Sequence, residues 1–328
     1  MDNIGILKFA PIYKETVWGG RRIAELKGIP PSGDHIGESW EISGVSGSES
    51  VVSEGRYAGL VLGSLCSLLK DRLLGRHVLA STGEEFPLLI KFIDANADLS
   101  VQVHPDDALA AKRHSCRGKT EMWYVLGAEP GASLLSGLSK PIDRERYGQM
   151  VADGSIMDCL TRYYVKPGDV FFLPAGRIHA IGAGCLIAEI QQTSDITYRI
   201  YDYGRLGLDG KPRQLHTGEA IDAIDYSVLP DYRTAYMPAK DRETVVADCR
   251  YFRTSVLDLT APFEKDIRSL DSFLVAMCLE GAGTASCASE PGVKLRRGET
   301  ILFPADSPSV TFIPDGNMKL LTSYMPKI

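Results

Sequence analysis

The residues of this sequence that are best suited to chemistry begin with one stretch, residues 99–107, in which polar and apolar side chains alternate. Ser100, Gln102 and His104 fall on one face of the expected strand, and the two valines between them fall on the other. A hydroxyl, an amide and an imidazole that are buried in a sheet need partners, which a metal ion or a polar substrate can supply. This polar face therefore predicts a binding site.

Two later stretches add a carboxylate and a second imidazole. Glu121 begins an apolar run, and His179 follows a Gly-Asp turn and a short apolar strand. With His104 they form a candidate metal site, and Gln102 is a fourth, oxygen ligand, because mixed imidazole and oxygen ligands suit Zn²⁺, Mn²⁺, Fe²⁺, Co²⁺ or Ni²⁺. Three side chains and one exchangeable position are typical of catalytic sites. Either histidine alone would favour a hydrogen-bonded core residue, but the four residues together favour a metal.

Two cationic residues could act beside such a metal. Lys119 lies two residues before Glu121 and shares its face of the strand, so its side chain could reach the site; the alternative is a lysine in a loop. Arg199 stands in an alternating strand between Tyr198 and Ile200. The alternative for Arg199 is an arginine on the strand surface that pairs with Asp195 or Asp202.

Composition and charge exclude several classes of function. The chain has 328 residues, a formal net charge of −6 and no long basic run, so we expect no nucleic-acid partner. No apolar stretch approaches the length of a membrane span, and the first residues lack a charged-then-apolar signal pattern. Seven dispersed cysteines without a C-x-x-C pair indicate reduced thiols. We therefore expect a cytoplasmic protein that does not act at a membrane.

Many short apolar runs joined by glycine and proline turns predict an all-β sandwich or barrel with a few peripheral helices. Leucines at helical spacing predict one amphipathic helix within residues 59–79, and shorter helices are expected at residues 106–112 and 142–154. In an alternating strand near the N-terminus, Trp40 is interpreted as a core aromatic residue and Glu41 as a solvated carboxylate.

A weak internal repeat indicates two β modules. Residues 166–175 resemble residues 296–305 in their turn and in the strand that follows it. In the aligned second copy, Ser309 and Val275 stand in the places of the predicted histidine and glutamate ligands. The second copy therefore keeps the turn and lacks the metal ligands, so only the first module is expected to be catalytic.

The boundary between the modules is expected within residues 228–243, a stretch that contains proline and aspartate and has little periodicity. Residues 1–230 are then a catalytic domain with helical insertions. Residues 240–328 are expected to form a degenerate C-terminal β domain.

Five segments together resemble the type I mannose-6-phosphate isomerases in their short bacterial form. They have the order and spacing of that family's motifs, and they are residues 88–93, 99–106, 118–124, 172–180 and 195–203. The resemblance spans most of residues 1–220, and the C-terminal part matches only as a degenerate β module. It implies a cupin jelly-roll fold, one bound divalent metal that is expected to be Zn²⁺, and interconversion of mannose 6-phosphate and fructose 6-phosphate.

The resemblance also implies roles for particular residues. The family's metal ligands carry over onto Gln102, His104, Glu121 and His179, and its active-site arginine carries over onto Arg199. The chemistry agrees with these roles. Moving a carbonyl from C1 to C2 of a sugar removes a proton beside a carbonyl and places negative charge on the oxygens of an enediolate, which a divalent metal and a cation stabilise.

Proton transfer in such a reaction needs a general base. The residues alone offer Asp195, Glu189 and Lys119, and hydroxide at the metal is a fourth possibility. The sequence does not choose among them.

The phosphate group of the expected substrate needs an anion pocket, and the sequence has no Gly-rich phosphate loop to supply one. By family position, the expected contacts are Ser100, Lys91 and Arg205. Lys91 interrupts an apolar run, so its side chain either reaches the surface or faces a site that holds an anion.

A hexose phosphate is thus the expected partner, and the protein is expected to be a monomer or a homodimer. A rival enzyme class is a cupin Fe²⁺ dioxygenase, which more often presents three histidines with a carboxylate. A second alternative is a metal-binding cupin that has a sugar-binding or regulatory role and no isomerase activity. The intact set of predicted ligands argues against this second alternative.

Overall fold

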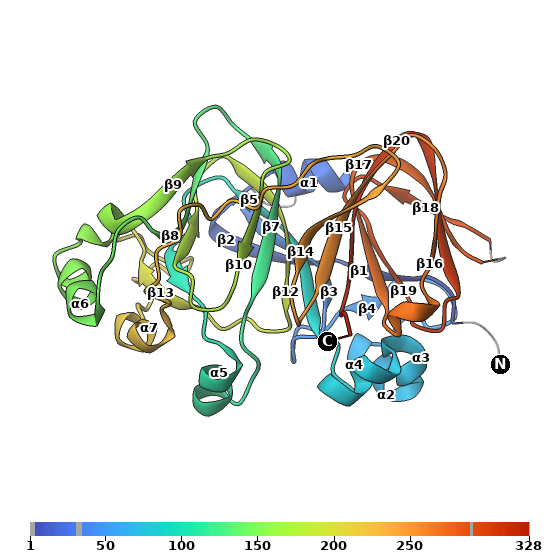
Figure 1. The fold of residues 1–328 in the computed structure, drawn as a ribbon, viewed down its shortest axis with the longest axis horizontal. Coiled ribbons are helices and arrows are strands. Elements are labelled where there is room, and N and C mark those ends of the chain that lie inside the picture. The colour runs from blue at the N-terminus through green and yellow to red at the C-terminus, as the bar shows by residue number, and fades with distance from the viewer. Residues whose placement is uncertain (1–3, 31–34, 289–290, 328) are drawn as a thin grey trace.

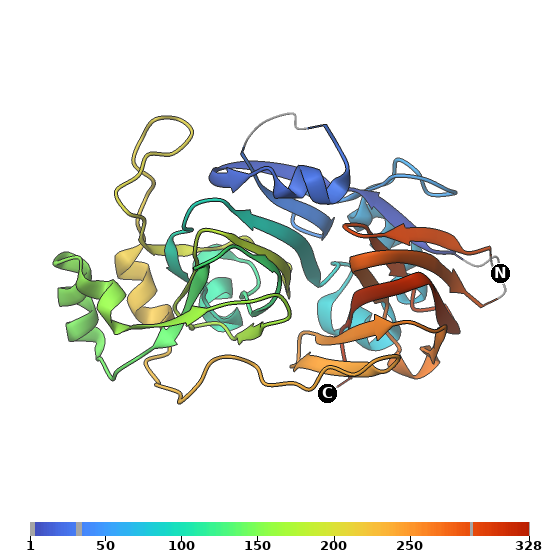
Figure 2. The same ribbon diagram turned by 90° about the horizontal axis from the view of Figure 1, so that it is seen from above.

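The computed structural model describes residues 4–30, 35–288 and 291–327. It contains three antiparallel β-sheets, with helices at their margins (Figure 1). Two of the sheets form a first module at one end of the long axis, and the third forms a second module at the other end (Figure 2). The predicted all-β fold with two modules and peripheral helices is confirmed.

The first module has a six-stranded sheet and a five-stranded sheet. In spatial order, the first consists of β10 (Val170–Leu173), β7 (Glu121–Ala128), β12 (Cys185–Gln192), β5 (Leu88–Ala95), β3 (Ile36–Ser43) and β2 (Ile12–Gly20). The second consists of β13 (Tyr198–Tyr201), β6 (Val101–Val103), β11 (His179–Ile181), β8 (Ser133–Leu138) and β9 (Leu160–Tyr164).

The two sheets of the first module pack face to face through an apolar layer. Trp123 and Phe171 of the larger sheet belong to the same buried cluster as Leu134 and Ile181 of the smaller sheet. Inward-facing side chains of both sheets thus exclude water from the space between them. A polar residue that points into this space must find a partner there, which is the condition that positions the site described below.

The second module is a nine-stranded sheet that includes strands from both ends of the described chain. Its main path is β14 (Glu243–Asp248), β15 (Arg253–Leu259), β20 (Ser309–Tyr324), β17 (Leu274–Cys287), β19 (Thr300–Phe303), β1 (Leu7–Ala10) and β4 (Val51–Val52). Two further strands, β16 (Phe263–Asp266) and β18 (Val293–Arg296), pair with β20 and β17. The N-terminal strands β1 and β4 therefore complete the C-terminal sheet.

The internal repeat corresponds to one turn that is built in the same way in both modules. Gly168 and Gly298 occupy it with φ values of 92° and 84°, a region that glycine adopts without steric cost. The amide of Gly168 donates to the carbonyl of Val125 at 2.9 Å, and the amide of Gly298 donates to that of Cys278 at 2.8 Å. The aligned turns are therefore structurally equivalent.

The register of the neighbouring strands corrects one detail of that alignment. Glu121 pairs with Leu173 in the first module, and the equivalent pair in the second module joins Leu274 to Phe303. Leu274, rather than Val275, thus stands where the first module has its carboxylate. A one-residue shift moves a side chain to the other face of a strand, which a short sequence alignment does not detect.

The segment predicted to be one helix within residues 59–79 is broken into three. They are α2 (Leu62–Leu69), α3 (Asp71–Leu74) and α4 (Arg76–Thr82). Lys70 and Gly75 separate them with φ values of 48° and 92°, which no α-helix accommodates. Leu60 and Leu68, expected on the buried face, are exposed.

Within the described residues, four other helices flank the sheets: α1 (Arg22–Lys27), α5 (Asp107–His114), α6 (Arg144–Ala152) and α7 (Thr217–Ala223). Short 3₁₀ turns cover Ser155–Cys159 and Arg268–Leu270. The helices predicted at 106–112 and 142–154 are confirmed as α5 and α6. Asp106 caps α5, since its carboxylate accepts a hydrogen bond from the Leu109 amide at 2.8 Å. Each helix in the described parts of the chain is too short or too polar to cross a bilayer.

The two modules share one continuous hydrophobic core, in which residues such as Leu88 and Met122 of the first module cluster with Phe273 and Val275 of the second. A buried ion pair lies at the same junction. Lys27 Nζ is 2.5 Å from Glu41 Oε2 and also donates to the carbonyl of Gly298. The interpretation of Glu41 as a solvated carboxylate is therefore wrong: its side chain is buried, because α1 carries a cation directly over it.

Candidate active site

His104 follows the last residue of β6 and is 1% exposed. Pro105 has no amide hydrogen to continue the ladder, so the strand ends and the histidine turns toward the opposite sheet. Its Nδ1 lies 2.9 Å from the carbonyl oxygen of Ile196. A carbonyl can only accept, so Nδ1 carries the hydrogen and Nε2 of the neutral ring presents its lone pair.

His179, the first residue of β11, is oriented in the same way. Its Nδ1 donates to the carbonyl oxygen of Arg177 at 2.8 Å, which leaves Nε2 as the free lone pair. The rings of His104 and His179 come from neighbouring strands, and their centroids are 4.8 Å apart. Backbone carbonyls thus fix both imidazoles as donors of an Nε2 lone pair, as is usual for metal-ligating histidines.

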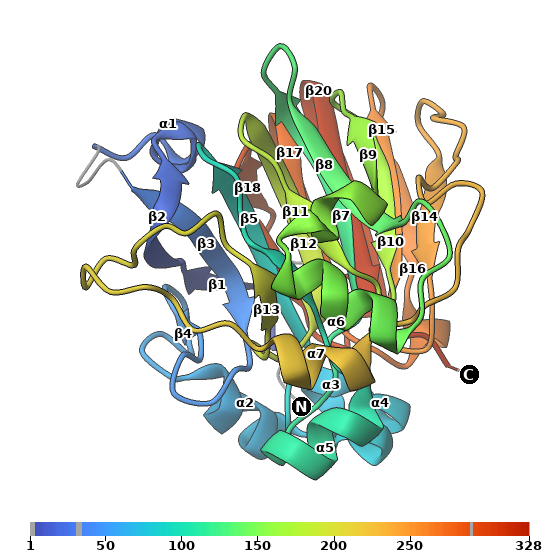
Figure 3. The ribbon, with the colours of Figure 1, turned by 90° about the vertical axis from the view of Figure 1, so that its left-hand side faces the viewer.

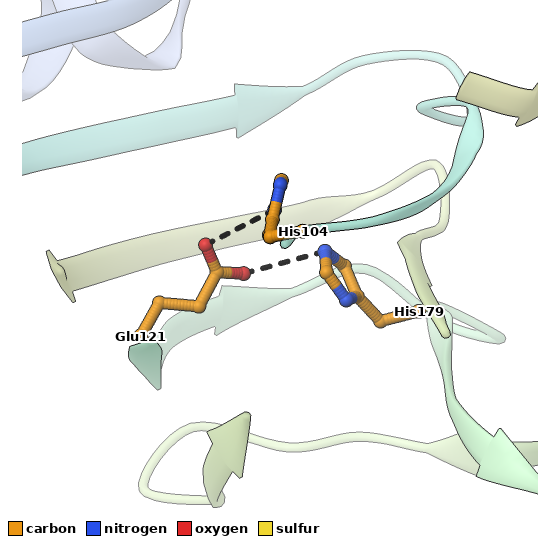
Figure 4. Close-up of side chains that lie close together, drawn as sticks. All are labelled: His104, Glu121 and His179. Carbon is orange, nitrogen blue, oxygen red and sulfur yellow. Dashed lines mark ion pairs between the residues drawn. The ribbon is translucent and has the colours of Figure 1, made fainter. Parts of the chain in front are cut away.

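Glu121 begins β7 on the opposite sheet and points at both histidines (Figure 4). Its Oε2 is 3.4 Å from His104 Nε2, and its Oε1 is 3.4 Å from His179 Nε2. The side chain is fully buried, and Oε1 has no hydrogen-bond partner among the described residues. A buried carboxylate oxygen without a donor is costly unless a cation satisfies it.

This cluster fits a divalent metal. One ligand atom from each of His104, Glu121 and His179 lies within 4.8 Å of the others. Burial, together with the nearby Lys119 ammonium, lowers the pKa of His104 to about 4. Burial opposes ionisation of Glu121, yet Lys119 and the histidines hold the pKa of its carboxyl well below the usual value. At neutral pH the cluster therefore offers two neutral imidazoles and one carboxylate, the protonation state that a metal requires.

Lys119 also reaches this cluster, although it comes from the loop that precedes β7 and not from the strand in which it was expected. Its Nζ is 2.9 Å from His104 Nε2 and forms an ion pair with Glu121. Glu189 Oε1 lies 3.9 Å from the same ammonium. Lys119 does lie in a loop, since β7 begins only at Glu121, but the lysine is 5% exposed and its side chain is buried against the cluster. The Lys119 ammonium thus stands beside two of the three candidate ligand atoms and balances the Glu121 carboxylate.

Gln102 occupies the middle of β6, where it lies across from His179 on one side and from Arg199 on the other. Its Nε2 is 3.3 Å from His179 Nε2. Gln102 and Lys119 also line the cavity described next, so they connect the buried cluster with the substrate-sized space beside it.

A polar cavity of about 340 Å³ adjoins the cluster. Strands β2, β3 and β5 contribute Trp18, Trp40 and Lys91, and the loop between β13 and α7 contributes Arg213 and His216. That loop projects from the first module and is drawn in yellow (Figures 2 and 3). The volume lies within the ~300–1,000 Å³ typical of small-molecule sites.

Arg199 lies in β13 and faces this cavity. Its Nη1 donates to the carbonyl of Gln214 at 2.8 Å, whereas its buried Nε has no partner among the described residues. Asp202, one of the two carboxylates proposed as alternative partners, is instead held by Arg205 at 2.8 Å and by Arg213 at 2.6 Å. The Arg199 guanidinium therefore retains donor capacity toward the cavity.

Comparison with known proteins assigns the family. The family model described as phosphomannose isomerase type I, catalytic domain, matches residues 6–124. Mannose-6-phosphate isomerase ManA of Bacillus subtilis is 34% identical over 302 residues, which cover 91% of this chain and 92% of ManA. The chain belongs to the type I mannose-6-phosphate isomerase family.

Comparison with solved structures shows that the similarity of this chain to the family extends over the whole fold. A crystal structure of the mannose 6-phosphate isomerase from Bacillus subtilis superposes with a TM-score of 0.87 at 30% identity, and it covers 97% of this chain and 99% of that chain. A mannose 6-phosphate isomerase crystallised with zinc and yttrium gives a TM-score of 0.78 at 18% identity, with 98% and 100% covered. At 18% identity the second likeness concerns the fold alone.

The other predicted site residues of this isomerase-family chain differ in their placement. Ser100 is buried and lines the cavity, and Asp195 lines it from an exposed position. Lys91 also lines the cavity and is 6% exposed, so it does not extend to the surface. Among the described residues, Arg205 is not part of the cavity lining, since its guanidinium is engaged with Asp202.

The Lys91 ammonium faces two carboxylates, which have further partners of their own. Its Nζ is 3.0 Å from Glu189 Oε1 and 3.5 Å from Glu38 Oε2. Trp123 Nε1 donates to the other oxygen of Glu189 at 2.7 Å. Burial opposes the charge of Lys91, but Glu189 and Glu38 outweigh it and raise the pKa of the ammonium. Lys91 therefore stays charged within the cavity.

Several residues that line the cavity were not among those predicted from the sequence. Trp40, interpreted as a core aromatic residue, does have a buried ring, but it also lines the cavity and donates from Nε1 to Glu38 Oε2 at 2.5 Å. Arg213 and His216 come from a loop without periodicity. The one available signal was the alternation of Glu38 and Trp40 in β3, which indicates a strand but not which face the cavity occupies.

Proposed function

We propose that this chain interconverts mannose 6-phosphate and fructose 6-phosphate through an enediolate, in the cavity beside the His104–Glu121–His179 cluster. The observation that carries this proposal is the cluster itself: two oriented, neutral imidazoles and a carboxylate are buried between the sheets and connect through Gln102 and Lys119 with a polar cavity. Membership of the isomerase family and the cavity volume support the same reaction.

His104, Glu121 and His179 would hold one divalent cation, with Gln102 as an additional oxygen ligand. We propose Zn²⁺, since two imidazoles with oxygen ligands suit it and a relative of the same fold was crystallised with zinc. When bound, the cation supplies positive charge that stabilises negative charge developing on the sugar oxygens.

The chain's own residues supply the remaining functions of the site. Arg199 lines the cavity and keeps one donor, Nε, without a partner among the described residues, and we assign its guanidinium to the negative oxygen of the enediolate. Proton transfer between C1 and C2 falls to the set Lys119, Glu189 and Asp195, because each lines the cavity. Lys119 and Glu189 lie 3.9 Å apart on the buried side, so a proton passed to either stays shielded from bulk water.

We assign the phosphate group to the part of the cavity that holds Ser100 and Lys91. Lys91 is already balanced by Glu189 and Glu38, so a dianionic phosphate needs further positive charge. Arg213 lines the cavity and can supply it. The expected contribution of Arg205 would then be indirect, through the Asp202 carboxylate that both arginines share.

Three further proposals concern the whole chain. Residues 1–230 carry catalysis, and residues 240–328, with the strands β1 and β4, form the supporting module. The protein works in the cytoplasm, which its metabolic substrate suggests. It acts as a monomer or a homodimer, because the proposed site is built from one chain.

The test is a coupled assay for fructose 6-phosphate formed from mannose 6-phosphate. It uses purified protein before chelation, after chelation, and after addition of Zn²⁺, Mn²⁺ or Co²⁺. Loss of activity on chelation and recovery with metal supports both the reaction and the role of the cluster. Metal binding without isomerisation of this substrate would overturn the proposal in favour of a sugar-binding or regulatory cupin.

The variant His179→Ala separates the metal from the fold. It should lose bound metal and activity together, while circular dichroism and the unfolding transition remain close to those of the parent protein. Ser309→Ala is the matched control, because Ser309 occupies the corresponding position of the second module. Full activity of His179→Ala with metal still bound would contradict the ligand assignment.

A further inference from the structure

The backbone that carries Lys119 and Glu121 into the site is held by two backbone hydrogen bonds, Lys119 to Pro105 and Gln192 to Thr120, and by two side chains. Residues 117–120 lie between α5 and β7 and have no regular secondary structure. The amide of Gly118 donates to Asp107 Oδ1 at 2.9 Å, and the amide of Thr120 donates to Gln192 Oε1 at 2.9 Å. Two of these backbone donors therefore depend on two side chains for their partners.

Those two side chains are also bonded to each other. Gln192 Nε2 donates to Asp107 Oδ1 at 3.0 Å, so the carboxylate oxygen that receives the Gly118 amide also orients the glutamine. The segments approach closely here, since a Cβ on Gly118 would lie 2.5 Å from the backbone of Asp106 and Asp107. Hydrogen bonds to a carboxylate are stronger than those between neutral groups, so Asp107 is the centre of this arrangement.

The second module supplies the remaining bond to that carboxylate. Tyr251 precedes β15, and its hydroxyl donates to Asp107 Oδ2 at 2.7 Å. The two oxygens of Asp107 thus have different partners: Oδ1 holds the segment before β7, and Oδ2 is held by the other module. A chain of hydrogen bonds therefore runs from Tyr251 through Asp107 and Gln192 to the residues that flank Lys119.

We propose that Tyr251 is a positioning residue of the isomerase site, through which the C-terminal module sets the place of Lys119 and Glu121. This inference rests on the proposed function for its catalytic consequence, but its consequence for metal binding is independent of the reaction. Tyr251 does not line the substrate cavity. Its loss should therefore act on turnover and metal affinity, and leave substrate affinity unchanged.

The experiment compares Tyr251→Phe with Tyr236→Phe. Tyr236 lies in the segment that joins the modules, and its hydroxyl donates to the carbonyl of Gly168. Gly168 belongs to the turn before β10, which is remote from the end of β7 that carries Glu121. Each variant loses one hydroxyl and the hydrogen bond that this hydroxyl donates to the first module. Metal affinity is measured by titration of Zn²⁺ into the chelated protein, and kcat and KM are measured with saturating Zn²⁺.

We expect Tyr251→Phe to lower kcat and weaken Zn²⁺ binding, each by about tenfold, the range found when groups behind metal ligands are removed. KM should change less than twofold, and Tyr236→Phe should resemble the parent protein in all three quantities. Equal kcat and Zn²⁺ affinity in Tyr251→Phe and the parent would overturn the proposal. So would equal losses in both variants, because that outcome would reflect general loosening of the junction.

A double-mutant cycle with Asp107→Asn tests the route. If Tyr251 acts through Asp107, Tyr251→Phe should have less than a twofold effect on Zn²⁺ affinity in the Asp107→Asn background. Additive effects would overturn the route. Absence of isomerisation by the parent protein would instead overturn the proposed function, and the Zn²⁺ titrations would still decide the positioning role.

Discussion

Gln102 and His179 face each other across β6 and β11, with Gln102 Nε2 3.3 Å from His179 Nε2. The lone pair that a metal would use on His179 is thus the one that the glutamine amide now contacts. Gln102 can turn its amide so that the oxygen replaces the nitrogen, and it then faces a cation instead of a lone pair. The same residue is therefore suited to the cluster with and without metal.

Removal of this amide should weaken metal binding without abolishing it. Gln102→Leu is expected to lower Zn²⁺ affinity on the order of tenfold, because three ligands remain. Zn²⁺ titration monitored by competition with a chelating dye measures the change. Ser136→Ala is the control, since Ser136 pairs with His179 from the other neighbouring strand and its hydroxyl has no partner among the described residues. Loss of all binding in Gln102→Leu would make the glutamine an indispensable ligand.

Arg199 should contribute to turnover and not to metal binding. Arg199→Ala is expected to retain metal and to lose about 10²–10³-fold in kcat, the cost of removing a donor to developing negative charge. Metal analysis of the purified variant and steady-state kinetics together check this. Arg162→Ala serves as the control, because it removes an arginine that is bonded to Ser133 at the opposite edge of the same sheet. A variant that kept more than a tenth of parental kcat would argue against the assignment.

Arg213 and Arg205 should differ in their effect on substrate affinity, although both bind Asp202. Arg213 lines the cavity, so Arg213→Ala is expected to raise KM for mannose 6-phosphate by about tenfold or more, as loss of a charged hydrogen bond implies. Arg205→Ala should raise it less than threefold. Steady-state kinetics over a wide substrate range measures both. The reverse order would assign the phosphate contact to Arg205.

His216 should give the protein an acid-sensitive contact. Its Nδ1 accepts a hydrogen bond from the Arg199 amide at 3.2 Å, which only the deprotonated nitrogen can do. Burial lowers the pKa of His216 below its usual value, so the unfolded chain binds the proton more readily than the folded one. The stabilisation is complete above the unfolded pKa of about 6.5 and is lost as pH falls through the lower folded pKa.

His216→Asn retains an acceptor that does not titrate. Between pH 7.5 and 5, its free energy of unfolding should therefore fall less steeply than that of the parent protein. Urea unfolding of both chelated proteins at several pH values measures the two slopes. The other histidines are present in both proteins, so the difference reports His216. Identical slopes would show that this contact does not depend on protonation.

The ion pair between the modules should be sensitive to removal of one partner. Lys27→Met leaves Glu41 buried without its cation and should cost about 3–5 kcal/mol in the free energy of unfolding. Lys319→Met breaks a more accessible pair with Glu280, 2.7 Å long, and should cost less than about 1 kcal/mol. Urea unfolding with metal present compares them. A small loss in Lys27→Met would show that Glu41 is readily neutralised by a proton.

Much of the site could be predicted from the sequence, because it depends on local rules. The two-residue period of a strand puts Ser100, Gln102 and His104 on one face. Lys119 reaches the site from the loop before β7, which that period does not predict. Pro105 and Asp106 end one strand and begin one helix through their own backbone chemistry. Two histidines, a glutamate and a glutamine in otherwise apolar strands indicated a metal site from the sequence alone, because buried polar side chains need partners.

Only the tertiary structure determines which segments of the chain meet in space when they are separated in the sequence. Lys27, the partner of Glu41, lies 14 positions away, and Gln192 and Tyr251, partners of Asp107, lie 85 and 144 positions away; no local pattern encodes such pairs. The breaks at Lys70 and Gly75 likewise override a helical leucine pattern, because packing on the sheets outweighs propensity. Periodicity determines which face a side chain occupies, whereas only the folded chain determines what that face meets.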